Sequence, residues 1–317
     1  MHLEAISRKS TIVAIILLAV ILLAAVLRFW FAPYQVELAD SGAHERVWLA
    51  IVAILLYFGN ALLQGKSLQR TGLCSGKCAL PMPLYGLLAC GVFVAPDMMA
   101  SSMASICFAL ALYQLLRSLH NVEEKDSVFL AAMLLGVTTL FYPPCIVLSA
   151  VIPFAVFTLA LSLRQVLLML IGYVLPLFAA SYVTWYRGGG LFDVCSNIYS
   201  GLAIPQMSEI SQVPNLAIIF VATVAVLFVW GSLRVVIRPT KTFMLARVRR
   251  AFYFYLCVFL STLAMLLIPG CDLSVCAIVA VPLTILLSFV LDILPGAIST
   301  LAYWALLLLF TVHLFVA

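Results

Sequence analysis

The 317 residues are 66% hydrophobic and only 9% charged, with a formal net charge of +5. Soluble domains are roughly 45–50% apolar and about 25% charged, so no soluble fold could bury this much apolar surface. Barrel strands would alternate apolar and polar residues, and this alternation is absent, which leaves helices as the spanning elements. The composition therefore predicts an all-α polytopic transmembrane bundle in contact with the lipid bilayer. Basic residues interleaved with aromatics are lacking, so no nucleic-acid partner is expected.

The apolar runs predict about eleven transmembrane helices, within a range of roughly nine to twelve. The first run lacks a small-residue cleavage site and is expected to be a retained helix. Pro143 and Pro144 are expected to form a turn. The predicted helices cover residues 11–32, 47–64, 82–95, 98–116, 127–142, 145–163, 166–186, 216–236, 251–268, 273–291 and 296–317.

A single membrane domain is predicted for residues 1–317. Residues 1–186 hold the first seven helices, and residues 216–317 hold the last four. Between them, residues 187–215 form an outer segment in which apolar residues recur at helical spacing from Leu191 to Leu202. This spacing predicts a short amphipathic helix in the membrane interface, either guiding a lipid-linked ligand or only packing on the bundle.

The basic residues predict the orientation of the helices. With the N-terminus in the cytoplasm, only Arg28, Arg46 and Arg187 of the 17 basic residues fall on the outer side. Lysine and arginine concentrate in the cytoplasmic loops of membrane proteins. The chain is therefore expected to be a multi-pass protein of the cell inner membrane, and its basic excess needs no acidic substrate.

The first outer loop, residues 33–46, is the main candidate for chemistry. It holds Glu37, Asp40 and His44, in a chain with few ionisable groups. A carboxylate at a membrane edge can act as a general base, and His44 is spaced to orient Asp40. The alternative is an ordinary solvated loop in which Asp40 or Ser41 caps the next helix.

The cysteines predict neither a metal site nor a cofactor. Cys74 and Cys78 form a C-x3-C pair in an inner loop, but no second cysteine or histidine pair accompanies them. Cys195 and Cys271 are both expected to face outward, where a disulfide could form in an oxidising compartment.

Parts of the first half resemble a known superfamily. Leu27-Arg28-Phe29 with its acidic outer loop, the run 95–98, the run 109–117 and the run 130–140 resemble the GT-C glycosyltransferases. These membrane enzymes use polyprenyl-phosphate sugars. The resemblance covers about Arg28–Trp185.

The chain also looks like an uncharacterised family of integral membrane proteins of about 300 residues from Bacteroidota. This likeness lies in the run 116–119, the charged loop that follows, and the run 138–142. It implies no established function.

The GT-C resemblance implies transfer of a sugar from a polyprenyl-phosphate donor on the outer side. In that hypothesis Asp40 is the base, Glu37 assists it, and Arg187 pairs with the donor phosphate. The rival hypothesis is a non-catalytic scaffold that docks a membrane protein partner, for instance through a small-residue face around Gly136. A lipid or solute carrier is the third alternative. The sequence leaves open whether the protein is an enzyme.

Overall fold

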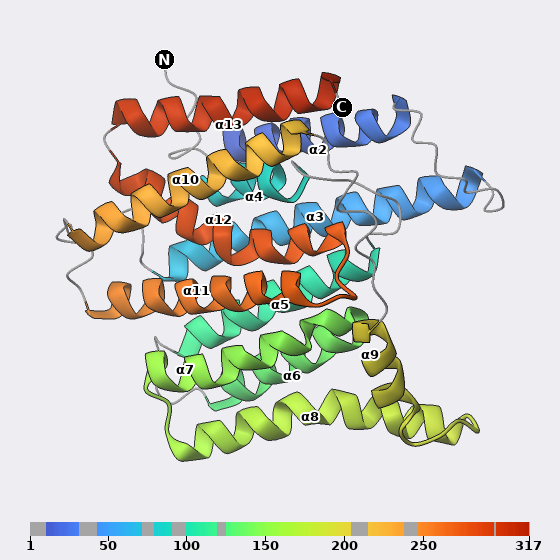
Figure 1. The fold of residues 1–317 in the computed structure, drawn as a ribbon. Coiled ribbons are helices and arrows are strands. Elements are labelled where there is room, and N and C mark those ends of the chain that lie inside the picture. The colour runs from blue at the N-terminus through green and yellow to red at the C-terminus, as the bar shows by residue number, and fades with distance from the viewer. Residues whose placement is uncertain are drawn as a thin grey trace.

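A computed structural model describes residues 11–31, 43–71, 79–90, 99–118, 125–203, 215–237, 246–294 and 296–316. Every regular element within these ranges is a helix, as the all-α prediction requires (Figure 1). The elements are α2 (Thr11–Phe31), α3 (Ala43–Thr71), α4 (Pro81–Cys90), α5 (Met99–Ser118), α6 (Lys125–Phe141), η2 (Pro143–Ala150), α7 (Val151–Leu159), α8 (Leu163–Tyr186), α9 (Asp193–Ala203), α10 (Asn215–Ile237), α11 (Ala246–Ala264), η4 (Met265–Leu267), η5 (Leu273–Val275), α12 (Cys276–Ile293) and α13 (Gly296–Val316).

Most of the long helices lie side by side, and α12 is the most buried of them (Figure 1). It is apolar all round, and it packs against α4, α5, α10 and α11. A helix without a polar face belongs in a core or in a membrane. At the other extreme, α8 forms one edge of the bundle and exposes most of its apolar side chains.

Five described helices are long and apolar enough to cross a bilayer. They are Met99–Arg117, Leu163–Tyr186, Ala217–Ile237, Val248–Leu267 and Leu273–Ile293. Shorter apolar helices cover Thr11–Ala25, Pro81–Cys90, Asp126–Phe141, Pro143–Leu159 and Ala297–Val312. The protein is thus a helical membrane protein, but the described residues do not support the expected count of about eleven spans.

Two of the predicted spans differ from the structure for physical reasons. Of the segment expected over residues 82–95, the structure describes residues 82–90, which belong to α4, and all 10 residues of α4 are buried. Ten helical residues rise about 15 Å, half of the hydrocarbon thickness. The segment expected over residues 145–163 is split into η2 and α7, and Pro143 and Pro144 begin η2 instead of forming a simple turn.

Other predicted segments are confirmed within a few residues. The amphipathic segment is α9, the segment 98–116 is α5, and the segment 216–236 is α10. The segment 47–64 is part of a longer helix, α3, which continues through the polar residues that follow it. Apolar length alone therefore places the predicted end too early, because Gln64, Ser67 and Leu68 continue the helix while buried against other helices.

A buried hydrogen-bond network joins four helices inside the bundle. The Asn60 side-chain amide donates to the Tyr85 hydroxyl at 2.8 Å and to Ser105 Oγ at 2.7 Å. Ser105 Oγ donates to the Ala277 carbonyl at 2.8 Å, and Gln64 donates to Asn60 at 3.3 Å. These side chains are almost fully buried. Because unpaired polar groups are costly in an apolar medium, the network fixes α3, α4 and α5 against the start of α12.

Paired glycines let α6 and α8 approach closely. A Cβ on Gly136 would overlap the Tyr173 carbonyl and lie 2.6 Å from Pro176 Cγ. A Cβ on Gly172 would lie 2.7 Å from the Phe129 carbonyl oxygen. Small residues allow this kind of backbone contact between membrane helices. The Gly136 face, expected to serve a partner in the scaffold hypothesis, is therefore occupied by α8 of the same chain.

We expect Gly172→Ala to destabilise the protein by about 1–3 kcal/mol, because the added methyl group meets the backbone of α6. Gly59→Ala is the matched control, since the nearest atom to its Cβ is Ile106 Cδ1 at 3.4 Å. Alanine is favoured over glycine in a helix, so this control should be neutral or stabilising. Thermal unfolding of both variants in detergent measures the difference. Equal unfolding midpoints for the two variants would contradict the close contact between α6 and α8.

Candidate functional site

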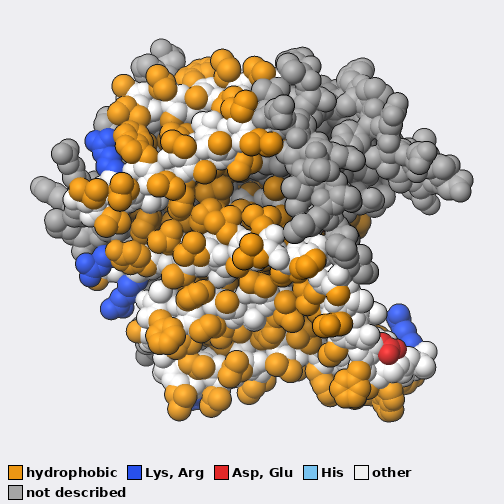
Figure 2. Space-filling model, viewed as in Figure 1, with side chains coloured by type: hydrophobic (Ala, Val, Ile, Leu, Met, Phe, Trp, Pro, Cys, Tyr) orange, Lys and Arg blue, Asp and Glu red, His pale blue; other side chains and the backbone are white. Residues whose placement is uncertain are grey.

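The two ends of the bundle differ in charge. Described arginines lie where α8 begins, at the end of α10 and at the start of α11: Arg164, Arg234, Arg249 and Arg250. We call this the basic end, and Lys and Arg side chains gather along it in Figure 2. The opposite end, where α8 turns into α9, is the α9 end. There the view shows a basic side chain next to an acidic one.

A half-buried carboxylate stands at the α9 end, between η4 and η5. Asp272 Oδ1 accepts hydrogen bonds from the Tyr142 hydroxyl and from Ser274 Oγ, both at 2.6 Å. The Asp272 backbone N–H donates back to the Tyr142 hydroxyl at 3.3 Å. Both hydroxyl donors use Oδ1, so neither occupies Oδ2. This geometry fixes the orientation of the carboxylate while leaving one oxygen for a further donor.

The buried tyrosine and its cysteine neighbour keep their protons. Burial and the adjacent Asp272 carboxylate raise the pKa of the Tyr142 hydroxyl well above its usual range. Burial likewise raises the pKa of the Cys271 thiol from 9.0 to about 11. At neutral pH Tyr142 is therefore a hydrogen-bond donor to Asp272, and Cys271 is an unreactive thiol.

The helix α9 docks against this carboxylate loop through glycines. The Gly270 N–H donates to the Leu202 carbonyl at 3.2 Å, and a Cβ on Gly270 would overlap the Gly201 carbonyl. A Cβ on Gly201 would lie 2.9 Å from Pro143 Cγ. The C-terminal turn of α9 thus lies directly on the loop that carries Asp272, although none of the residues of α9 is fully buried.

Exposed aromatic side chains lie on the last turns of α8, in the turn that follows and on α9. They are Tyr182, Trp185, Tyr186, Phe192 and Tyr199. Aromatic side chains concentrate where a bilayer meets water. Such a grouping is typical of a membrane–water boundary.

Arg187 follows the last turn of α8. Its N–H donates to the Val183 carbonyl at 3.1 Å, and its side chain is exposed. Gly188 has a φ of 92°, which is the left-handed conformation that glycine adopts most readily. The Gly190 N–H donates to the Asp193 carboxylate at 2.6 Å, which closes the turn into α9.

Arg187, a candidate from the sequence, lies apart from the Asp272 carboxylate. Arg187 precedes α9, whereas Asp272 lies against its C-terminal turn. The 11 residues of α9 span a rise of about 16 Å between the two positions. Glu37 and Asp40 lie outside the described residues. His44 falls within α3, in a part where only the backbone is described.

Sequence reasoning missed the cluster of Tyr142, Asp272 and Ser274. No site role was predicted for Asp272 or Tyr142. The residues that hydrogen-bond are 130 positions apart in the chain. Because the two partners are this far apart, no local pattern of residues indicates their pairing.

The other expectations for this end concern cysteines and metals. Cys195 and Cys271 are free thiols, the first exposed and the second buried, so the suggested disulfide is not formed. Cys74 and Cys78 lie outside the described residues. Within the described parts of the chain, no group of three or more His, Cys, Asp or Glu side chains is placed to hold a metal ion.

A comparison with protein families gives one match. A family described as "Family of unknown function (DUF6427)" matches residues 1–316. No curated protein and no solved structure matches the chain.

We expect Tyr142→Phe to lower the free energy of unfolding by about 1–2 kcal/mol, because it removes a hydrogen bond to a charged acceptor. Tyr182→Phe is the control, since Tyr182 lies exposed on α8. Denaturation in mixed micelles at neutral pH measures both variants. If both variants lose the same free energy of unfolding, the Tyr142–Asp272 hydrogen bond does not stabilise the protein.

Proposed function

Since the chain belongs to the DUF6427 family of unknown function, we propose its role from geometry and from the GT-C resemblance. It is a multi-pass inner-membrane protein that transfers a sugar from a polyprenyl-phosphate donor at the α9 end. In this proposal the α9 end faces outward and the N-terminus is cytoplasmic. The observation that carries the proposal is the Asp272 carboxylate, which two hydroxyls orient and on whose loop the amphipathic helix α9 docks.

The arrangement of the basic residues supports the orientation. The described arginines of the basic end cluster at one side of the bundle, as cytoplasmic loops do. With that end in the cytoplasm, α9 lies in the outer interface. In the same proposal the five long apolar helices cross the membrane and the shorter apolar helices pack among them.

The surface of α9 supports a lipid-linked ligand. Phe192 and Tyr199 are 75% and 74% exposed, so an apolar chain in the bilayer can lie against them. Arg187 stands at the N-terminal side of α9 with an exposed guanidinium. Arginine pairs with phosphate through two parallel N–H donors, which suits it to hold the phosphate of the donor.

The reaction needs a base near an acceptor hydroxyl. The acceptor oxygen attacks the anomeric carbon, the carbon–oxygen bond to phosphate breaks, and polyprenyl phosphate leaves with the bonding electron pair. A carboxylate takes the proton of the acceptor hydroxyl. Asp40, assisted by Glu37, is the base proposed from the sequence. Asp272 is a second candidate, with Oδ2 directed to neither of its hydroxyl partners.

The rival function is a non-catalytic scaffold of a cell-envelope complex. The exposed apolar face of α8 favours it, because Leu167, Ile171, Val174 and Phe178 follow one another at helical spacing along the outermost helix. Lipid alone also covers such a face. A stoichiometric protein partner that dissociates on substitution of this face would support the scaffold.

The decisive test uses protein purified gently from its own membranes and supplied with undecaprenyl phosphate. Native mass spectrometry should find this lipid on the wild type, and Arg187→Gln should retain it about fivefold less, as expected for loss of one cation near a phosphate. Arg164→Gln, an exposed arginine of the basic end, is the control and should retain the lipid.

The same membranes separate the two candidate bases. Transfer of labelled sugar from the endogenous donor pool should fall by about 100-fold or more in the variant that loses the base, either Asp40→Asn or Asp272→Asn, while lipid binding persists. Glu37→Gln should reduce transfer less. Unchanged transfer in all three variants would remove the enzymatic assignment.

A further inference from the structure

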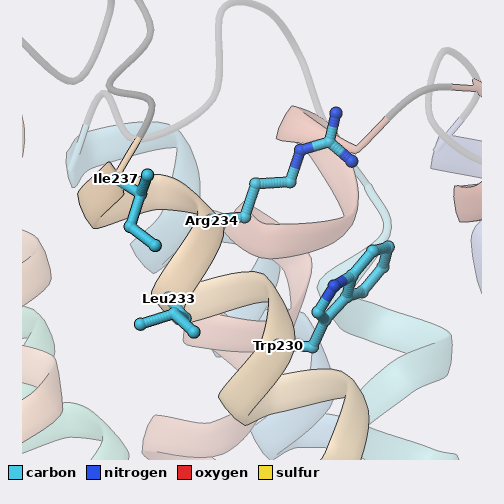
Figure 3. A pocket seen from close by; sticks show the side chains of 4 residues that line it. All are labelled: Trp230, Leu233, Arg234 and Ile237. Atoms are coloured by element: carbon cyan, nitrogen blue, oxygen red, sulfur yellow. The ribbon is translucent and has the colours of Figure 1, made fainter.

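A groove lies on the last two turns of α10, at the basic end. Its cavity volume is about 340 Å³, and the described residues that line it are Trp230, Leu233, Arg234 and Ile237 (Figure 3). It is far along the bundle from α9, because α10 ends where the basic end begins (Figure 1). It is therefore independent of the proposed transferase site.

The groove has two chemically different sides. The guanidinium carbon of Arg234 lies 5.9 Å from the centre of the Trp230 ring, and the two side chains stand together on one side of the helix (Figure 3). At this distance the ring attracts the cation and holds the long side chain in place. Leu233 and Ile237, also four residues apart, form the aliphatic side and are 56% and 65% exposed.

The charge of Arg234 is not neutralised by the described parts of the chain. No described carboxylate forms an ion pair with it, and Arg249 and Arg250 stand exposed in the first turns of α11, across the same connection. The half-buried guanidinium presents its N–H donors beside the groove. The described arginines at this end of the bundle favour an anionic ligand.

The packing of α10 against α12 determines which face of α10 carries the groove. Gly231 lies against Val290 of α12, where a Cβ would overlap the valine side chain. The turn that carries Gly231 is thus pressed onto the buried central helix. The residues that line the groove are displayed on the remaining surface of α10, whose apolar length is that of a membrane-crossing helix.

We propose that this groove binds an anionic phospholipid, with Arg234 paired to the phosphodiester and an acyl chain against Leu233 and Ile237. Free phosphate would use only the guanidinium and would leave the aliphatic side without a ligand. A zwitterionic phospholipid would carry its own cation toward Arg234, Arg249 and Arg250. An anionic headgroup with its acyl chains satisfies both sides of the groove.

The test uses the full chain in nanodiscs that contain dioleoylphosphatidylcholine and dioleoylphosphatidylglycerol in equal amounts. After gentle release, native mass spectrometry counts the lipids that remain bound. The wild type should retain phosphatidylglycerol in preference to phosphatidylcholine. Arg234→Gln should lower the bound phosphatidylglycerol about fivefold, the effect of one basic residue near an anionic lipid surface.

Two control variants make the result specific. Arg164→Gln removes an exposed arginine from the same end and should leave the retention unchanged. Arg234→Lys keeps the charge but loses the planar pair of donors, so it should retain an intermediate amount. Arg164→Gln should keep the thermal midpoint of the wild type. Arg234→Gln should lower the midpoint only slightly, because it removes the contact with the Trp230 ring but no ion pair within the described residues.

Several outcomes would overturn the proposal. Equal retention in the wild type and Arg234→Gln would exclude the guanidinium as the anchor. A matching loss in Arg164→Gln would show general attraction to a basic surface. Displacement of phosphatidylglycerol by an equal concentration of inorganic phosphate would identify a phosphate ion, and not a lipid, as the ligand.

Discussion

The hydrogen-bond network around Asn60 is the constraint on which the rest of the bundle depends. In an apolar interior an unpaired amide or hydroxyl is costly, so these side chains have few alternative arrangements. The network ends on the Ala277 carbonyl, one residue into α12. It therefore fixes the register of the central helix against α3, α4 and α5. Apolar packing alone would tolerate sliding, because leucine and valine contacts are not directional.

The position of the carboxylate follows from that register. Asp272 lies five residues before Ala277, joined to it by the single turn η5. Fixing the start of α12 thus places Asp272 at the end of α6, where Tyr142 meets it. The docked α9 then rests on the same loop through Gly201 and Gly270. The hydrogen-bond network around Asn60 and the Asp272 carboxylate are thus structurally linked. Along the chain, about one and a half helical turns separate Ala277 from Asp272.

Much of the fold could be predicted from the sequence, because apolar length and periodicity are local properties. The amphipathic helix α9 and the long apolar helices α5 and α10 lie where their patterns place them. The number of spans could not be predicted in the same way, since α4 is apolar but only 10 residues long and is enclosed by other helices. Apolar composition does not distinguish a residue that faces lipid from one that faces protein.

The candidate site was less predictable. Arg187 is one of three basic residues expected on the outer side, with its phosphate role implied by the GT-C resemblance, and the structure shows it exposed beside a glycine turn. The pairing of Tyr142 with Asp272 joins segments 130 residues apart, which no local pattern encodes. The close approach of α6 and α8 at Gly136 and Gly172 likewise depends on both helices, so neither helix alone predicts it. Contacts between distant segments depend on the complete packing of the chain.

The sidedness of the bundle is the claim that all the functional assignments share. The native Cys195 is an exposed thiol on α9, and an Arg249→Cys variant supplies a thiol at the basic end. A membrane-impermeant maleimide is applied to intact spheroplasts and to lysed membranes, and the labelled peptides are identified by mass spectrometry. The account predicts that Cys195 is labelled equally in both samples, whereas the introduced cysteine is labelled only after lysis. Labelling of Cys195 only after lysis would place α9 in the cytoplasm and contradict the account.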